Sequence, residues 1–425
     1  MRARICQILV LFFFIAFSPP LKAEELLTWE QCVSETRASH PDLSSALALL
    51  QQAEADKRIT GGARLPQLGL ATTTQQNGSF VNGSSFSQLR SYSLSAQQLL
   101  FDGQKTSSQV ASNEESIKAA QYNYSAVSSD VRFALRSAFA ELLKAQELLA
   151  LTGEIADRRQ KNVRLISLRY QGGREHIGAL RQAQADLAQA EFEVAQAGWG
   201  IVLAQVKLAS ALGRDIHKPL RVQGAFRVSD MLSVKPDFEL LAKNSPLFQQ
   251  LDTRSKSARY DLDAARNAFA PELFLTSSVG RSSVQRWPFD AVDWSAGLTL
   301  SVPIYEGGIG RARVSKAMAV VSQQTAQAKS GFLQIFDTLQ ESWKSFQDAR
   351  QMVVVQKKFL DAAIERSSIA NAQYSNGLIT FNDWVIIENN LVSAKKSYLN
   401  AGAALLIAEA QWIHAKGGAL DGQQE

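Results

Sequence analysis

Apolar residues recur at helical spacing along two long stretches of the chain. In the first stretch they step by four and three residues through Val131, Leu135, Ala138, Leu142, Ala145 and Leu149. In the second stretch the same steps run through Ile335, Leu339, Ser342, Phe346, Ala349 and Val353. Such heptad spacing predicts long helices that pack along a narrow stripe, as in a coiled coil.

The two stretches belong to an internal duplication with one constant offset. Residues 101–213 correspond to residues 305–417 without an insertion, so each position in the first copy has a counterpart 204 residues later. Tyr170 answers to Tyr374, and Gly173 answers to Gly377. A chain of this length would ordinarily suggest two or three domains. The duplication predicts two copies of one unit instead.

Proline and glycine positions set the expected helix lengths. No proline lies between Gln67 and Lys218 or after Pro303, and proline is the residue that most strongly breaks a helix. Glycines at 172–173 and at 377 are the natural turns. Each copy is therefore predicted to contain an outgoing helix of up to about 70 residues and a return helix of about 40. Both helices would be far longer than an average helix. Gly153 and Gly331 fall inside the outgoing helices and are interpreted as weak points that packing tolerates.

A period of two replaces the helical period after Pro66 and after Pro271. In residues 294–304 every even position is apolar or small, which predicts a strand with two different faces. We predict its partner at 271–282, and a matching pair at 66–76 and 89–101. Strands of roughly 10 to 13 residues can cross a hydrocarbon layer when they are tilted. The aromatic residues near the predicted strand ends suit a membrane interface; they are Tyr92, Phe101, Trp287 and Trp294.

Four strands cannot close a barrel by themselves. Open sheet edges are not tolerated in lipid, because unpaired backbone groups there cost several kcal/mol each. Two or three chains would therefore have to share one barrel. The alternative is a soluble sandwich of two hairpins, which requires the export signal, the strand pattern and the helical repeat to coincide by chance.

The first 23 residues have the pattern of a secretory signal peptide. A basic start is followed by an apolar run from Ile5 to Phe17, and Ala23 precedes an acidic pair. The run is too short to span a bilayer as a helix. Neither Cys6 nor Cys32 lies where a lipid-anchoring cysteine must, so we expect no lipid anchor. Cys32 is expected to be a core thiol.

The expected division of the chain follows from these patterns. The signal peptide covers 1–23 and the first repeat covers 24–213, with its strands at about 66–101 and its helical hairpin at about 103–213. An irregular connector at 214–237 is expected to pack at the waist of the molecule. The second repeat covers 238–418, with strands at about 271–306 and helices at about 307–417, and a tail covers 419–425.

Composition and motifs give no sign of enzyme chemistry. Removing Arg2, Arg4 and Lys22 with the signal peptide lowers the formal charge from +5 to +2, and no basic cluster favours nucleic acid. The four histidines lack metal-ligand spacing. Residues 307–310 imitate a dinucleotide-binding loop, but Arg313 stands where the third glycine belongs. No nucleophile motif is present either. We expect no catalytic residue, no metal and no cofactor.

The order of elements, repeated twice, resembles the TolC family of outer-membrane efflux proteins. The matching motifs are Leu27-Thr28-Trp29-Glu30, His40-Pro41-Asp42, Leu65-Pro66, Phe101-Asp102-Gly103, Tyr305-Glu306-Gly307 and Arg169-Tyr170 before Gly173. Each motif is weak alone, but the arrangement is specific and covers essentially the whole mature chain. The resemblance implies a homotrimer with a shared 12-stranded barrel in the outer membrane of a Gram-negative bacterium and a 12-helix coiled-coil tube in the periplasm.

The resemblance also implies a function and partners. The expected function is a passive exit duct for small toxic compounds, working with a periplasmic adaptor (membrane fusion) protein and an inner-membrane transporter. A duct for a type I protein secretion system is nearly as compatible, because it differs in partner and not in fold. A periplasmic coiled-coil adaptor or scaffold is the alternative from another class. It is disfavoured because an adaptor normally has one helical hairpin flanked by compact β domains.

The resemblance points to the hairpin tips for the functional residues. Family members carry a carboxylate six residues past the tip glycine that narrows the periplasmic entrance, and Asp383 stands there, whereas the first copy has Ala179. Tyr374 resembles the aromatic residue at the constriction, and Glu175 would supply charge in the first copy. The alternative for Asp383 is a helix-start acid favoured by the helix dipole.

The tips themselves are the expected adaptor-docking surface. It comprises Gly172, Gly173 and Arg174 in the first copy, and Gly377 and Leu378 in the second. The alternative is that these glycines only provide the positive φ of a tight turn. Gating, by the same resemblance, would be an iris-like movement in which the helix pair of the second copy relaxes outward.

Overall fold

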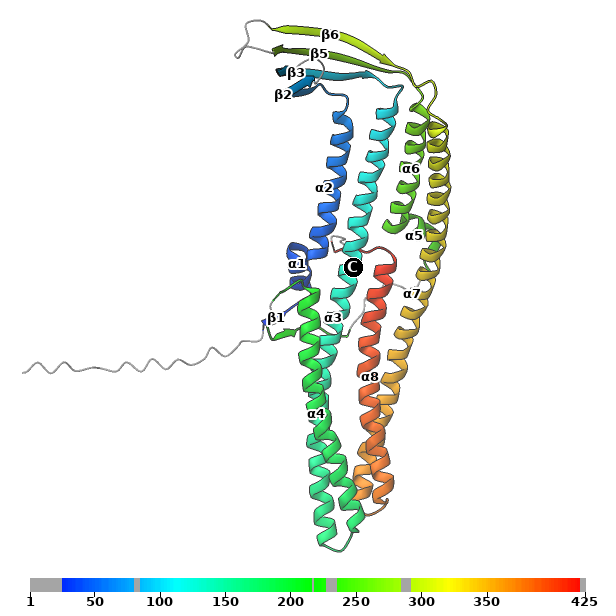
Figure 1. Cartoon of the computed structure of the whole chain (residues 1–425). Coiled ribbons are helices and arrows are strands. Elements are labelled where there is room, and N and C mark those ends of the chain that lie inside the picture. Colours follow the sequence, from blue (N-terminus) through cyan, green and yellow to red (C-terminus); the bar gives the residue numbers. More distant parts are fainter. Residues whose placement is uncertain (1–24, 80–84, 216–217, 227–234, 284–291, 421–425) are drawn as a thin grey trace, which may run out of the picture.

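A computed structural model of the chain describes residues 25–79, 85–215, 218–226, 235–283 and 292–420. The molecule is elongated, with a sheet at one end and two helical hairpins at the other (Figure 1). The predicted signal peptide at 1–23 lies outside the described residues. So do Trp287 and residues 421–425 of the predicted tail.

Two long helical hairpins make up the lower part of the molecule. The first consists of α3 (Lys105–Gln171) and α4 (Ile177–Ala211), and the second of α7 (Ile309–Ser375) and α8 (Phe381–Ala415). The outgoing helices have 67 residues each and the return helices 35, close to the predicted lengths. Near the tips the helices follow the order α4, α3, α8, α7, because α3 contacts both α4 and α8 while α7 contacts α8.

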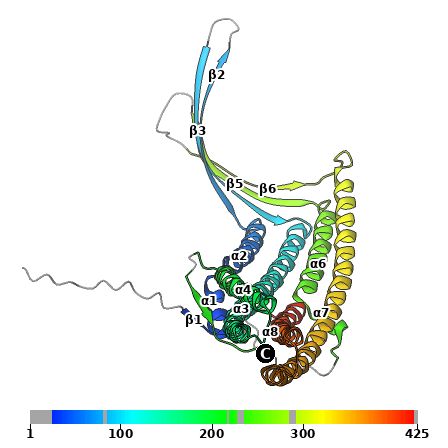
Figure 2. The same ribbon diagram turned by 90° about the horizontal axis from the view of Figure 1, so that it is seen from below.

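Shorter helices complete the upper part of the molecule. They are α1 (Trp29–Ser39), α2 (Pro41–Gly62), α5 (Phe238–Asn244) and α6 (Pro246–Asn267). Both α2 and α6 begin with a proline, whose fixed φ suits the first helical turn. Helix α2 packs on α3, and α6 contacts both α3 and α7. Seen along the long axis, α2, α3, α6 and α7 lie in one row (Figure 2).

A four-stranded antiparallel sheet forms the other end. Its strands are β2 (Gln67–Ser79), β3 (Ser85–Phe101), β5 (Glu272–Ser283) and β6 (Asp293–Ser301), in the order β2-β3-β5-β6. Strand β3 begins four residues earlier than predicted, so Tyr92 lies within the strand and not near its end. Where β3 meets β5, a Cβ on Gly280 would come within 2.3 Å of the Tyr92 carbonyl oxygen. Glycine is therefore needed for this close approach.

Left-handed residues join the sheet to the outgoing helices. Gly307 and Gly308 have φ of +61° and +86° directly before α7, and Gly103 and Gln104 have φ of +61° and +71° before α3. The glycines at 307–310 thus serve a strand-to-helix turn, as the comparison of the two copies predicted. None of the described helices is both long enough and apolar enough to cross a membrane.

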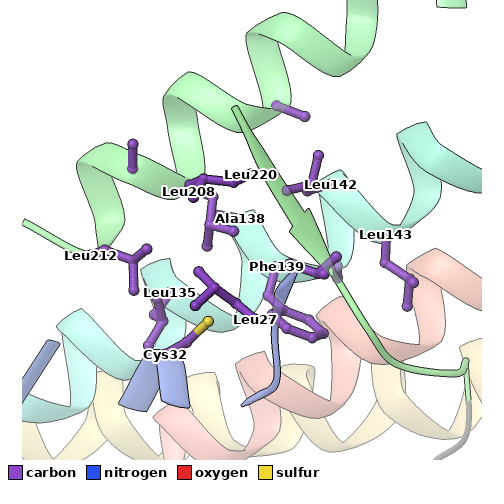
Figure 3. Close-up of a cluster of buried hydrophobic side chains, with 14 of the residues drawn as sticks. Leu27, Cys32, Leu135, Ala138, Phe139, Leu142, Leu143, Leu208, Leu212 and Leu220 are labelled. Carbon is purple, nitrogen blue, oxygen red and sulfur yellow. The ribbon is translucent and has the colours of Figure 1, made fainter. Parts of the chain in front are cut away.

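The waist contains a small sheet that the sequence did not predict. Strand β1 (Glu25–Leu27) pairs in parallel with β4 (Leu220–Val222), so the connector predicted to be irregular includes a strand. Leu27 and Leu220 face the apolar core around Leu135, Leu142 and Cys32 (Figure 3).

Cys32 and Arg214 show how this waist is held. Cys32 is fully buried, and burial raises the pKa of its thiol to about 12, as expected of a core cysteine. At the edge of the core, Arg214 forms salt bridges with Glu25 and Glu35. The hydrogen bond from Arg214 lowers the pKa of the Glu25 carboxyl. The start of the described chain is therefore fixed to the end of the first hairpin.

Candidate functional site

The two hairpin tips have the same backbone geometry. In the first, Gly173 has φ of +66° and the Arg174 N–H donates to the Arg169 carbonyl at 2.8 Å. In the second, Gly377 has φ of +74° and the Leu378 N–H donates to the Gln373 carbonyl at 2.9 Å. Both turns are the left-handed helix ends that glycine favours. The tips lie at the end of the molecule farthest from the sheet (Figure 1).

The exposed side chains at the tips differ in chemistry. Arg174 gives the first tip an exposed cation, whereas Leu378 gives the second an apolar side chain that is 73% exposed. Gly172 ends α3, and its N–H donates to the Leu168 carbonyl at 3.0 Å. A Cβ on Gly173 or Gly377 would meet open space, so φ alone restricts these positions to glycine.

Asp383 is exposed and lies in the first turn of α8. Its N–H donates to the Thr380 hydroxyl at 3.2 Å, and that hydroxyl lies 2.6 Å from the Asp383 carboxylate. The acid therefore takes part in capping α8. In the first copy, His176 Nδ1 accepts the Ala179 N–H at 3.1 Å, and Ala179 is 1% exposed. The counterpart of Asp383 thus faces the protein interior.

Tyr374 is buried between the two hairpins in the single chain. Its ring stacks on Trp384 at 4.6 Å, and the Arg169 guanidinium lies 4.5 Å from the ring centroid. Arg169 also donates to the Tyr374 carbonyl oxygen at 2.9 Å. Burial raises the pKa of Tyr374 to about 12, with a further rise from the Glu175 carboxylate and an opposing effect of Arg169.

Three buried polar atoms of this cluster have no hydrogen-bond partner within the described structure. They are the Tyr374 hydroxyl, Arg169 Nε and Glu175 Oε2. Glu175 is half-buried just beyond the first tip glycine. Its charge acts on Tyr374 across the space between the hairpins, which brings two of the predicted aperture residues into one neighbourhood.

A charged cluster that sequence reasoning missed lies nearer the waist. Arg158 on α3 donates to the Glu388 carboxylate on α8, from Nε at 2.6 Å and from Nη2 at 2.9 Å. Arg158 also donates to the Ser367 hydroxyl on α7 at 2.7 Å. Glu388 and Ser367 are 2% and 1% exposed. The available signal was a departure from the repeat, since Arg158 corresponds to Ala362 and Glu388 to Gln184.

The predicted interface aromatics are found at different depths of the sheet. Trp294 is 78% exposed at the start of β6, and Phe101 is 53% exposed at the end of β3. Tyr92 is half-buried within β3. Among the described residues, no group of three or more His, Cys, Asp or Glu side chains is arranged to hold a metal ion.

Comparison with protein families and curated proteins gives one consistent answer. The family model described as "Outer membrane efflux protein" matches residues 32–214 and 238–418. "Probable outer membrane lipoprotein SilC" of Salmonella typhimurium is 21% identical over 91% of this chain and 85% of that protein. "Outer membrane protein TolC" of Escherichia coli K12 is 22% identical over 95% of this chain and 84% of that protein.

Solved structures share the fold at low sequence identity. A CusC structure has a TM-score of 0.82 at 19% identity and covers 91% of both chains. The MtrE outer membrane channel of Neisseria gonorrhoeae has a TM-score of 0.81 at 19% identity, covering 92% of this chain and 89% of that one. The architecture of a helical tunnel with a β-domain is thus common to these channels.

Proposed function

The chain belongs to the outer membrane efflux protein family, and from this premise we propose that three copies form the outer-membrane exit duct of a tripartite pump for small molecules. The family consists of channels and not of enzymes. The partners in this proposal are a periplasmic adaptor and an inner-membrane transporter.

The difference between the two faces of the sheet supports the proposal that one face contacts lipid. Leu70, Leu94, Val279 and Trp294 are aligned across all four strands, and each is exposed, from 41% for Val279 to 79% for Leu70. Directly aligned residues share one face of a sheet. The neighbouring row of Gly69, Ser95, Ser278 and Ser295 is small or polar and faces the other way. One apolar face and one polar face suit lipid outside and water inside.

The open edges of every layer support a ring of chains. The first repeat forms one edge, with β2, α2 and α4, and the second repeat forms the other, with β6 and α7. An edge of one chain that meets the opposite edge of the next gives a head-to-tail contact, and such contacts form a ring when the rotation between neighbours closes. Three copies would supply 12 strands, an even number as in bacterial barrels. They would also cover the edges that lipid does not tolerate.

Export assays in cells with and without this gene test the function. If several unrelated dyes accumulate in cells that lack the gene and the set of secreted proteins is unchanged, the proposed small-molecule duct is supported. If one secreted polypeptide disappears and dye accumulation is unaffected, the same duct serves type I protein secretion. A soluble periplasmic monomer in place of an outer-membrane trimer would contradict both.

We propose that Asp383 forms a ring of three carboxylates at the periplasmic aperture. Its exposure near the tip supports this role, and three acids close to the axis would attract cations. In planar bilayers, Asp383→Ala should weaken cation preference and block by divalent ions. Asp383→Asn removes the charge while keeping a side chain that can cap the helix, so it should have the same effect. Unchanged selectivity in both variants would remove Asp383 from the aperture, and Tyr374 and Glu175 would be tested in the same way.

Adaptor docking at the tips is proposed for Gly172, Gly173, Arg174, Gly377 and Leu378. The exposure of Arg174 and Leu378 supports contact with a partner of mixed charged and apolar character. Leu378→Asp should abolish co-purification of the adaptor and leave the trimer intact. The same substitution at the exposed Ile364, which lies away from the tip, is the control.

We also propose that the chain is exported without a lipid anchor. Cys32 is buried in α1 and is therefore not available for acylation. The SilC relative is named a lipoprotein, so the point needs its own test. Mass spectrometry of the mature N-terminus should give a peptide that begins at Glu24 without an added lipid. A lipidated terminus would overturn this proposal and leave the duct function untouched.

A further inference from the structure

The charged cluster around Glu388 connects the two hairpins, and Arg158 is its residue from the first hairpin. Ser367 donates to Glu388 Oε1 at 2.6 Å, and Trp384 donates to Asn371 at 2.7 Å, so these contacts lie within the second hairpin. Arg158 is the contribution of the first hairpin, with three hydrogen bonds to Glu388 and Ser367. Glu388 is 2% exposed. Separation of the hairpins would remove its ion-pair partner.

Further polar contacts lie along the boundary between the two hairpins. We call this boundary the intrachain seam, and it is the contact of α3 with α8 and α7 from residue 154 to the tip. Glu154 pairs with Lys395 at 2.6 Å nearer the waist. Arg159, next to Arg158, donates to the side chain of Asn389, and Arg169 donates to the Tyr374 carbonyl near the tip. Polar contacts therefore hold the intrachain seam together at several positions along its length.

The internal repeat shows what the corresponding contact between protomers would contain. In the proposed ring, α7 of one protomer meets α4 of the adjacent one, which we call the interchain seam. By the offset of 204 residues, Ala362 takes the place of Arg158, and Gln184 takes the place of Glu388. Ala363 and Ala185 take the places of Arg159 and Asn389. These four positions therefore cannot form the counterpart of the Arg158 and Glu388 ion pair.

One charged level is retained in the interchain seam with its signs reversed. Glu154 corresponds to Lys358, and Lys395 corresponds to Glu191. Lys358 and Glu191 are both exposed in the single chain. Opposite charges at matching positions can pair across the interchain seam nearer the waist. Below them, toward the tips, the counterparts of the Arg158, Arg159, Glu388 and Asn389 side chains are alanine and glutamine.

We propose that the four helices of each protomer move as one body near the tips, and that the aperture opens at the interchain seams, below the level of Lys358 and Glu191. A partial opening of the intrachain seam would leave Glu388 buried without its counter-charge, which is strongly unfavourable. The interchain seam has no such barrier. The proposal rests on the trimeric duct proposed above, and it differs from the expectation that the second hairpin relaxes outward alone.

Two matched cysteine pairs test which seam must open. Arg159→Cys with Asn389→Cys spans the intrachain seam, and Ala363→Cys with Ala185→Cys spans the interchain seam at the same level. The full-length protein is cross-linked in its own cells with a short bifunctional maleimide, while the buried Cys32 remains in place. Band size on denaturing gels identifies the link, and dye export gives the functional result.

The interchain link should produce covalent dimers and trimers and lower dye export to that of cells without the gene. The intrachain link should produce neither band and leave export unchanged. Loss of export with the intrachain link, at equal cross-linking yield, would overturn the proposal. Absence of any covalent oligomer, together with export that does not depend on the gene, would instead show that the trimeric duct itself is wrong.

A second experiment avoids cross-linking by moving the ion pair to the other seam. Ala362→Arg with Gln184→Glu recreates the Arg158 and Glu388 pair between protomers. The double variant should export less dye than either single variant, and the reversed pair, Ala362→Glu with Gln184→Arg, should act in the same way. Equal export by the double and single variants, at equal amounts of trimer, would show that the interchain seam is not the one that opens.

Discussion

The contact inside the first hairpin buries a regular row of alanines, whereas the contact between the hairpins buries an ion pair. Helix α4 packs on α3 with small residues buried at steps of seven, at Ala183, Ala190, Ala197 and Ala204. Between the hairpins, Arg158 meets the buried carboxylate of Glu388, and Glu154 meets Lys395. Alanines at heptad spacing let two helices approach closely over their whole length.

This difference separates the rigid parts of the molecule from the part that can switch. An alanine contact has no alternative partner, so it gains nothing from partial separation. A charged contact has two favourable arrangements, one paired and one hydrated, with an unfavourable state between them. The hairpins are therefore rigid units, and the choice between moving together and moving apart is made by the polar groups that join them.

Overpacking the alanine contact should have the largest effect on stability. Ala190→Leu inserts a larger side chain where α4 meets α3, and such substitutions cost about 1–3 kcal/mol. The heat-induced loss of trimer on gels and of tryptophan fluorescence should shift to a lower temperature. Ala188→Leu, at an exposed position of the same helix, should stay within about 0.5 kcal/mol of the parent protein. Equal shifts for both variants would contradict a close-packed hairpin.

Removing the charge of Arg158 should have an effect of similar size. Breaking a fully buried pair typically costs about 3–5 kcal/mol. The Arg158 side chain is 35% exposed, and water can partly replace it, so we expect about 2 kcal/mol for Arg158→Ala. Replacing both partners, as Arg158→Met with Glu388→Leu, should recover most of this loss, because no buried charge remains.

The control for Arg158 is an exposed ion pair. Lys357 pairs with Asp361 within α7 at 2.8 Å, and both side chains are more than half exposed. Lys357→Ala should leave the thermal unfolding temperature of the trimer nearly unchanged, because exposed ion pairs contribute little. If Arg158→Ala proves as mild as this control, the charged cluster does not hold the hairpins together.

The difference between contacts along one helix face and contacts between the hairpins also explains how much of the structure the sequence could predict. Heptad positions such as Leu135, Leu142, Leu339 and Phe346 are fully buried, as predicted, because a helix face is a local property of the pattern. Glycines at the tips were identified for the same reason. The Arg158 and Glu388 pair was not, because it joins residues 230 positions apart and depends on how two helices face each other.

Gly331 and Tyr374 show a second limit of reasoning from sequence. Gly331 was interpreted as a tolerated weak point, but a Cβ there would lie 2.2 Å from a methyl carbon of Leu251, so glycine permits the close contact of α6 and α7. Tyr374 was placed by its distance from the tip glycine, and its burial under Arg169 was not foreseen. Spacing along a helix fixes a position but not the neighbours that cover it.

The mildest test concerns the hydroxyl of Tyr374, which lies between the two kinds of contact. It is buried without a hydrogen-bond partner in the described structure, so at pH 7 Tyr374→Phe should be neutral or stabilise the protein by at most about 1 kcal/mol. Burial raises the pKa of Tyr374 to about 12, above the ordinary value of about 10, so the folded state favours the neutral ring. That contribution is complete below about pH 10 and is lost as the pH rises toward 12.

Thermal unfolding of the parent protein and of Tyr374→Phe at pH 7 and pH 11 separates these effects. The variant should gain roughly 1 kcal/mol relative to the parent at the higher pH, since one pKa unit corresponds to about 1.4 kcal/mol. Tyr170→Phe, at the 41% exposed counterpart in the first copy, should show no such gain. A Tyr374→Phe protein that is less stable at pH 7 would mean that the hydroxyl has a partner in the assembled trimer. Tyr374 would then belong to the contact between protomers, and the interchain seam would contain a hydrogen bond close to the tips.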